Sequence, residues 1–333
     1  MNRDVRKHRF TPWTTLVGSG QLGGGQMRSL LGLTLFVALT ACTKTVADDD
    51  DVQETPAFEV VSSDVTLAPG EETTRCFYFH TPNTTEVQIY KWISDMSPGS
   101  HHMIVFSSLG TQPADGTIDN CDGANIPVPI YGTQIPHEEL EFPADDGLGK
   151  PLAQTIAPNT AGFFQMHYLN TSDSPLVANV KLAAYPLPAG TEFTRTEIFA
   201  TYNNDIAIPP HATSYTVTAT CDVVDRKFWM ISSHSHKQSV ATSIKDGGAE
   251  IFTSTDWEHP GAKRWAAPTF QHFDTYQLTW SCTYDNTGDN ANSYIYAGQS
   301  AATNEMCMAT GYFFPATGPR GCVIDSGQCQ CLL

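Results

Sequence analysis

The sequence predicts an all-β protein built from antiparallel strands. Helical periodicity is nearly absent, whereas apolar and polar residues alternate over stretches such as 215–221 and 276–284. Such alternation places one set of side chains on each face of a strand. Turn signals such as Pro82-Asn83 and Asn286-Thr287-Gly288 separate these runs. The many Thr, Tyr, Val and Pro residues are typical of strands and of the turns that join them.

The chain is long enough for two β-sandwich domains, because 333 residues exceed what one sandwich needs. Leu187-Pro188-Ala189-Gly190 marks the expected boundary, and the stretch 119–159, with its many Pro and Gly residues, is expected to be loop-rich. The sequence therefore predicts a signal segment at 1–41, an acidic tether at 42–56, an N-terminal sandwich at 57–188, a C-terminal sandwich at 189–325 and a Cys-containing tail at 326–333.

The N-terminal segment has the features of an export signal. Leu30 to Ala41 is apolar but too short to span a bilayer. Its end, Leu39-Thr40-Ala41-Cys42, resembles a bacterial lipobox, in which Cys42 becomes the lipidated first residue of the mature protein. Met27-Arg28 would form a compact start, which makes Met27 the expected initiator. We expect a cell-envelope lipoprotein, in the outer membrane and facing the periplasm or the exterior, that meets the membrane only through its lipid.

Charge and cysteine content narrow the possible partners. The net charge of −17 makes nucleic acid an unexpected partner, because phosphate binding needs a basic surface. Nine cysteines are present, and without Cys42 an even number remains, as expected for disulfides in an exported protein. None has a zinc-type C-x-x-C spacing, and the pairing of Cys329 and Cys331 is left open.

One candidate metal set lies in the C-terminal half. His234-Ser235-His236 places two imidazoles on one face of a strand, and Asn304-Glu305-Met306-Cys307 offers a thioether. Imidazole suits copper and a soft thioether favours Cu(I), so the pattern indicates a copper centre. Met308 is a rival ligand, two residues further on the same face. Taken alone, a His-X-His pair more often lies on a surface strand.

A second candidate set lies in the N-terminal half. It comprises His101-His102, directly after the bend-forming Pro98-Gly99-Ser100, and His167 in the run Gln165-Met166-His167-Tyr168. Adjacent histidines on a regular strand point to opposite faces, so both reach one metal only at a strand end or bend. Alone, the set would be read as an exposed His pair and one core histidine. The two sets together favour metal binding at a site between two sandwiches.

These four motifs resemble, in order and spacing, the copper type II, ascorbate-dependent monooxygenases, which include peptidylglycine α-hydroxylating monooxygenase and dopamine β-monooxygenase. The resemblance covers roughly Thr55 to Val323 and implies two antiparallel jelly-roll β-sandwiches, with a copper site in each, that face a shared open cleft. It implies two coppers per chain, with electron-transfer copper on His101, His102 and His167 and oxygen-binding copper on His234, His236 and Met306. It also implies the disulfides Cys76–Cys121, Cys221–Cys322 and Cys282–Cys307.

The resemblance implies hydroxylation of an activated C–H bond with O2 and a one-electron donor such as ascorbate. No catalytic side chain is then needed beyond the metal ligands. Peptide-amidating members carry an Arg where this chain has Ser232, and an Asn and a Tyr where it has Met308 and Thr310. These replacements make the pocket more apolar. We therefore expect a small, weakly polar organic substrate and no peptide amidation.

Three other functions compete with this hypothesis. A copper-handling lipoprotein would keep the ligands but lack oxygenase chemistry. A hydrolase, such as a glycan-releasing amidase, would use cleft carboxylates, although Glu138-Glu139 and Glu258-His259 are expected on surface loops. A structural adhesin leaves the ordered histidines unexplained. The remaining lone histidines are expected on the surface or in the core, with one as a neighbour of a ligand: His80, His137, His211, His259 and His272.

Overall fold

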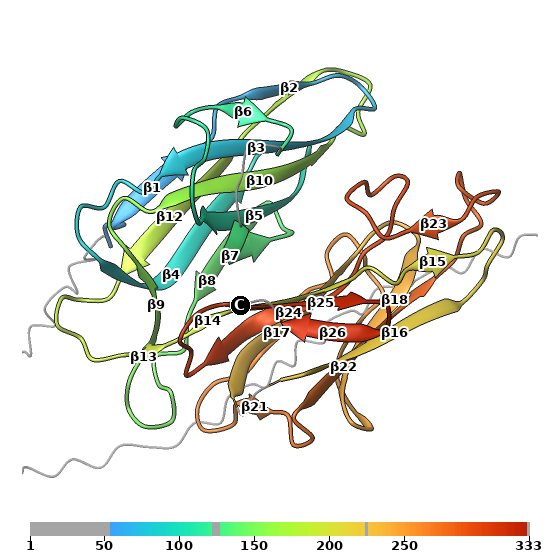
Figure 1. Cartoon of the computed structure of the whole chain (residues 1–333). Coiled ribbons are helices and arrows are strands. Elements are labelled where there is room, and N and C mark those ends of the chain that lie inside the picture. Colours follow the sequence, from blue (N-terminus) through green and yellow to red (C-terminus); the bar gives the residue numbers. More distant parts are fainter. Residues whose placement is uncertain (1–53, 122–126, 224–225, 332–333) are drawn as a thin grey trace, which may run out of the picture. The chain divides into compact units, whose positions relative to one another are not determined.

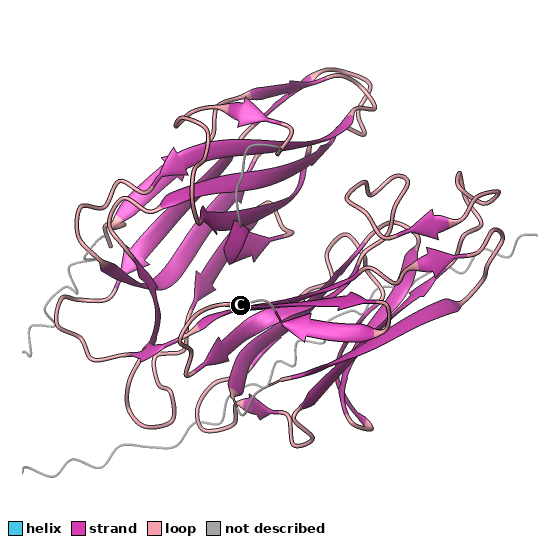
Figure 2. Ribbon diagram, in the orientation of Figure 1, coloured by secondary structure: helices cyan, strands magenta, loops and turns pink. Residues whose placement is uncertain are grey.

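A computed structural model describes residues 54–121, 127–223 and 226–331. Every regular element in these ranges is a strand (Figure 2), which confirms the all-β prediction. Within the same ranges, no helical segment has the length and apolar character needed to cross a bilayer. The predicted signal segment, Cys42 and most of the tether lie outside the described residues.

The first thirteen strands pair only among themselves and form what we call the N-terminal sandwich (Figure 1). Its core, which includes Trp92 and Phe164, is almost fully buried. One sheet has the order β1 (Phe58–Val61), β12 (Val180–Pro186), β4 (Val87–Met96), β9 (Leu152–Ile156) and β13 (Thr194–Arg195), with β8 (His137–Glu141) also on β4. The other has the order β6 (Ile118–Asp119), β3 (Glu72–His80), β10 (Ala161–Leu169), β5 (Ser100–Ser108) and β7 (Pro127–Thr133), and β2 (Val65–Leu67) pairs with β11 (Leu176–Ala178).

The remaining strands form the C-terminal sandwich, whose core contains Trp280 and Phe228. Its larger sheet has the order β20 (Ala262–Arg264), β17 (Lys227–Ser235), β24 (Cys307–Phe314), β14 (Glu197–Asn203), β25 (Arg320–Asp325) and β26 (Gln328–Cys331), with β21 (Gln271–His272) also on β17. The smaller sheet has the order β16 (Tyr215–Asp222), β22 (Gln277–Tyr284), β18 (Ser239–Asp246) and β19 (Ala249–Ser254), and β15 (Ala207–Ile208) pairs with β23 (Ile295–Tyr296).

The two sandwiches pack through aromatic side chains. Phe142, just after β8, lies with its ring centroid 5.1 Å from Trp229 and 5.7 Å from Tyr312 of the C-terminal sandwich. These three side chains belong to the same buried cluster as the N-terminal core. Strand pairing changes from one sandwich to the other after Arg195, seven residues beyond the predicted boundary at Pro188. The continuous apolar contact joins the two halves into one compact unit.

The stretch 119–159, predicted to be loop-rich, also contains regular strands. Strands β7, β8 and β9 all lie within it. Pro127 and Pro129 make β7 hard to recognise as a strand in the sequence. In the structure β7 is an edge strand of its sheet. Proline is tolerated on an edge because its missing N–H faces away from the ladder. The prediction that Glu138 and Glu139 lie in a loop is wrong, because both residues lie on β8.

Four disulfides are present in the described residues. Cys76–Cys121 and Cys282–Cys307 have the pairing that the resemblance implies. The implied Cys221–Cys322 pair is wrong, because Cys221 joins Cys329 and Cys322 joins Cys331. The chain end returns as β26, which places Cys331 opposite Cys322. The sulfurs of Cys221, Cys322 and Cys329 lie within 4.8 Å of one another, so sequence spacing alone does not select the pairing.

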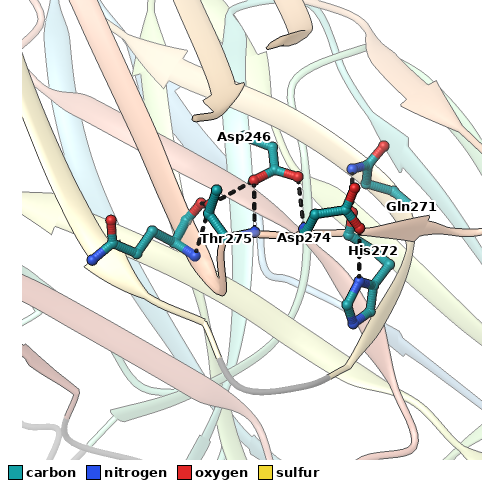
Figure 3. Close-up of polar contacts among 6 residues, drawn as sticks. Asp246, Gln271, His272, Asp274 and Thr275 are labelled. Carbon is teal, nitrogen blue, oxygen red and sulfur yellow. Dashed lines mark hydrogen bonds and ion pairs between the residues drawn. The ribbon is translucent and has the colours of Figure 1, made fainter. Parts of the chain in front are cut away.

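A polar cluster fixes the turn before β22, far along the C-terminal sandwich from the histidines. Asp246 at the end of β18 accepts hydrogen bonds from the backbone N–H of Asp274, at 2.7 Å, and from the Thr275 hydroxyl, at 2.6 Å (Figure 3). Tyr276, the next residue, has a φ of 57°. The carboxylate thus stabilises a turn whose backbone is sterically disfavoured for a tyrosine.

Candidate metal centre

A β-bulge brings His101 and His102 to one place. His102 lies directly opposite His167 in the β5–β10 ladder, but the next residue of β10, Tyr168, pairs with Ser100. His101 is therefore the extra residue of the bulge, which lets two successive side chains approach the same point. Gly99, with a φ of 89°, provides the bend that the sequence predicts before this strand.

His101, His102 and His167 form a compact, buried nitrogen set. Their candidate ligand atoms lie within 4.8 Å of one another. The Nδ1 atoms of His101 and His102 are 3.1 Å apart. Two imidazole ligands of one ion have a similar separation when metal–nitrogen bonds are about 2.0 Å long. The three rings can therefore serve a single ion.

Glu72 orients His167 by bonding the ring nitrogen that does not face the other histidines. Its Oε1 accepts a hydrogen bond from His167 Nε2 at 2.9 Å and a second from the backbone N–H of Ala301 at 2.9 Å. The first bond leaves Nδ1 as the free nitrogen of His167, and that atom is buried with no hydrogen-bond partner. The second bond joins the N-terminal sandwich to the loop that leads to Met306. Carboxylate–histidine pairs of this kind fix the ligand orientation at metal sites.

The other histidine pair lies at the end of β17. His234 Nδ1 donates to Gln134 Oε1 at 2.6 Å, and His236 Nδ1 donates to the Asn304 carbonyl at 3.1 Å. Both Nε2 atoms are buried and have no hydrogen-bond partner. Because each Nδ1 carries the proton, each Nε2 keeps a lone pair available for a metal. Gln134 belongs to the N-terminal sandwich, so it positions a ligand across the domain boundary.

Glu305 ties the methionine segment to the His-X-His segment. Its buried carboxylate accepts backbone N–H bonds from His236 at 2.9 Å, Gln238 at 2.8 Å and Met306 at 3.2 Å. Burial raises the pKa of Glu305 to about 8, although these amides oppose the shift. Met306 is 7% exposed and, like its rival Met308, lines the cavity beside the histidines. Met308 lies opposite His234 in the strand register, so both thioethers remain candidates.

The two histidine sets are in contact. The ring centroids of His102 and His234 are 5.0 Å apart, and those of His234 and His236 are 5.3 Å apart. The five histidines thus form one continuous cluster. The resemblance implies a different arrangement, with two groups on either side of an open cleft. Trp257, from the loop after β19, stacks on His101 with centroids 5.1 Å apart and closes the cluster on another side.

Burial keeps four of these imidazoles neutral, those of His101, His102, His234 and His236. Burial, with a smaller effect of neighbouring histidines, lowers the pKa of His101 to about 3, and burial lowers that of His236 to about 4. Burial also lowers the pKa of His102 and His234 well below the usual value. Neutral imidazole is the form that binds a metal. Imidazole nitrogens and a soft thioether together suit copper in both oxidation states.

A cavity of about 580 Å³ opens beside His102 and His234. Ser232, Met308 and Thr310, which replace polar family residues, all line it. His259 also lies on its wall, so one of the lone histidines does lie near the candidate ligands. The size and the largely apolar lining are typical of a small-molecule site.

Several positioning residues could not be recognised in the sequence. Glu72, Gln134 and Trp257 lie far from the histidine motifs along the chain, and none forms a motif of its own. Asn304 and Glu305 lie inside a recognised motif. The sequence does not show that the Asn304 carbonyl and the Glu305 carboxylate accept hydrogen bonds at the site. Only the packing of two sandwiches brings these groups to the cluster.

Comparison with known families identifies the C-terminal sandwich. Residues 195–331 match the model of the C-terminal domain of the copper type II ascorbate-dependent monooxygenases. The matched range begins where strand pairing passes to the C-terminal sandwich and contains His234, His236 and Met306. This part of the chain, about two fifths of its length, is thus similar to the C-terminal domain of that family. This family is copper-dependent and uses ascorbate as reductant.

Other comparisons are more distant. No curated protein matches the chain significantly. Among solved structures, the major capsid protein P2 of bacteriophage PM2 is 8% identical, with 78% of this chain and 100% of that chain covered and a TM-score of 0.32. PNGase F, a glycosylasparaginase from Flavobacterium meningosepticum, is 10% identical, with 78% and 96% covered and a TM-score of 0.29. At these scores neither likeness bears on the function of this chain.

The Glu72 contact predicts a specific loss of copper affinity. Glu72→Ala removes the acceptor that holds His167, so one of two copper sites should weaken by about 10- to 100-fold. Competition titration with a Cu(I) chelator measures both affinities. Glu71→Ala is the matched control, because Glu71 accepts only the Ala68 N–H within its own turn. Equal copper affinities in the wild type and Glu72→Ala would contradict the assignment.

The lowered histidine pKa values predict that the copper-free protein loses stability in acid. Below a pH of about 6.5 these histidines bind protons in the unfolded chain but stay unprotonated in the folded protein. The free energy of unfolding therefore falls as the pH decreases. Each such histidine contributes at most about 1.4 kcal/mol per pH unit. Urea denaturation at pH 7 and pH 5 measures the loss, which should be smaller in His102→Gln/His234→Gln. An equal loss of stability in the wild type and the double variant would contradict the neutral state of His102 and His234.

Proposed function

We propose that this protein is a copper-dependent monooxygenase that hydroxylates an activated C–H bond of a small organic substrate. The observation that carries the proposal is the buried cluster of five histidines beside a cavity of about 580 Å³ that Met306 lines. His101, His102 and His167 are the proposed ligands of one copper, and His234, His236 and Met306 those of the other. When bound, copper supplies one-electron redox chemistry and O2 activation, with ascorbate or a similar donor as reductant.

The protein itself positions the imidazole ligands and excludes water from them. Glu72, Gln134 and the Asn304 carbonyl hold three imidazoles with their free nitrogens toward the cluster. All five histidines are less than 9% exposed, so bulk water has little access to the ligand nitrogens. No described side chain needs to act as nucleophile or general base. This division of labour, with the protein as scaffold, is usual where a metal carries the reaction.

The cavity supports a small, weakly polar substrate. Ser232 uses its hydroxyl to donate to the Gly261 carbonyl at 2.5 Å, so it does not offer the positive charge that peptide-amidating members place there. Met308 and Thr310 add little polarity to the same wall. Peptide amidation is therefore not the proposed activity.

We also infer that Cys42 carries a lipid that anchors the folded domains to the outer membrane. The support is the lipobox pattern Leu39-Thr40-Ala41-Cys42 and the acidic run that follows it. The folded domains then face the periplasm or the exterior, where disulfides persist.

Copper stoichiometry tests the proposal directly. The soluble domain starting near Thr55 should retain about two coppers per chain after loading with Cu(II) and removal of loose metal. His236→Ala should retain about one, because one ligand set loses an imidazole. The loaded protein should then consume O2 with ascorbate in a reaction that depends on an added organic substrate and forms a hydroxylated product.

The rival functions give different results. Two coppers without substrate-dependent oxygen consumption would favour copper handling. Retention of no copper would reject the metal assignment and favour the hydrolase or adhesin. Met308→Leu and Met306→Leu form a matched pair for the thioether. Loss of Cu(I) affinity should follow Met306→Leu, and the same loss in Met308→Leu alone would reassign the ligand.

A further inference from the structure

The apolar cavity beside the metal centre contains one pair of opposite charges. Ile104, Ile198, Met230 and Leu140 provide apolar surface from both sandwiches. Among the described lining residues, the formal charges belong to Glu138 of β8 and Arg264 of β20. The cavity therefore has no excess charge at neutral pH, apart from any contributed by His259.

The two charges neutralise each other across the domain boundary. Arg264 Nη2 and Glu138 Oε1 form an ion pair at 2.5 Å, and the Glu138 side chain is only 18% exposed. Arg264 lies opposite Met230, four residues before His234 on β17. At a rise of about 3.3 Å per residue, this register places the pair roughly 13 Å from His234 along the strand. A ligand of small-molecule length spans that distance.

Two other polar side chains of the cavity lining, Ser232 and Gln134, are bonded within the protein. Ser232 donates to the Gly261 carbonyl. Gln134 accepts from His234 and donates to the Ser233 carbonyl at 3.2 Å. Neither offers an unpaired positive charge to a ligand carboxylate. Burial of a carboxylate without such a partner carries a large desolvation cost.

The ion pair still offers hydrogen bonds to a neutral group. A guanidinium has five N–H donors and a carboxylate has about four acceptor sites, and the bond from Arg264 Nη2 to Glu138 Oε1 uses one of each. A donor therefore lies beside an acceptor at the end of the cavity away from His234. A primary amide carries the complementary pair, a carbonyl oxygen and an N–H. A carboxylate can only accept, and it would also meet the negative charge of Glu138.

We propose that Glu138 determines the substrate charge, because its pairing with Arg264 admits a neutral ligand with an apolar body and an amide-like end and excludes a carboxylate. This inference rests on the proposed function, since it treats the cavity as the substrate pocket. Glu138 is a specificity-determining residue, and the Arg264–Glu138 pair takes the place of an unpaired arginine in the pocket.

The test compares two ligands of the same size, 3-phenylpropanamide and 3-phenylpropanoate. Isothermal titration calorimetry measures their binding to copper-loaded, oxidised protein without reductant, so no turnover occurs. The wild type should bind the amide at least tenfold more tightly. Glu138→Gln leaves Arg264 unpaired, so carboxylate binding should strengthen at least tenfold. Glu139→Gln is the matched control, because Glu139 lies on the opposite face of β8 and should leave both affinities unchanged.

A second variant separates charge recognition from direct binding of the carboxylate to copper. In Glu138→Gln/Arg264→Gln the gained carboxylate affinity should disappear, whereas binding to copper would persist. Equal wild-type affinities for the two ligands, or no gain in folded Glu138→Gln, would overturn the inference. Because binding is read without turnover, an inactive protein with charge selectivity would reject the proposed function only. An active protein without selectivity would reject this inference only.

Discussion

The ring of His102 packs against the ring of His234, and this contact between two sandwiches is the constraint on which the rest of the site depends. Each histidine comes from a strand with its own core, so their separation is fixed by how the sandwiches dock. Docking is maintained by the apolar contact of Phe142 with Trp229 and by bonds that cross the boundary from Glu72 and Gln134. Such partly buried polar links are costly to break when one partner is left without a hydrogen bond.

This docking also explains why the electrostatics favour a metal. Five imidazoles in one dry cluster cannot all carry protons, because burial and mutual repulsion oppose each charge. Four of the rings also carry a buried nitrogen that has no hydrogen-bond partner in the described residues, namely His101, His167, His234 and His236. Unpaired buried polar atoms are rare in folded proteins and call for a partner. Copper meets the chemistry of imidazole and thioether together, and the family match supports the same metal.

The sequence predicts the fold class and the candidate ligands because both depend on local patterns. Strict alternation predicts strands, and the Pro98-Gly99-Ser100 bend predicts that His101 and His102 share one site, which the β-bulge provides. The edge strand β7 was missed because its prolines resemble loop sequence. The positions of Glu72, Trp257 and Glu138 could not be predicted, because they arise from contacts between residues more than 90 positions apart.

The contact between His102 and His234 makes the two ligand sets one contiguous centre in the folded protein. Electron paramagnetic resonance of the fully Cu(II)-loaded protein tests it most directly, because the dipolar interaction between two unpaired electrons falls steeply with distance. The structure predicts a spectrum with strong dipolar broadening, which reverts to that of an isolated Cu(II) in His236→Ala. A wild-type spectrum equal to the sum of two independent Cu(II) signals would contradict the contact between His102 and His234.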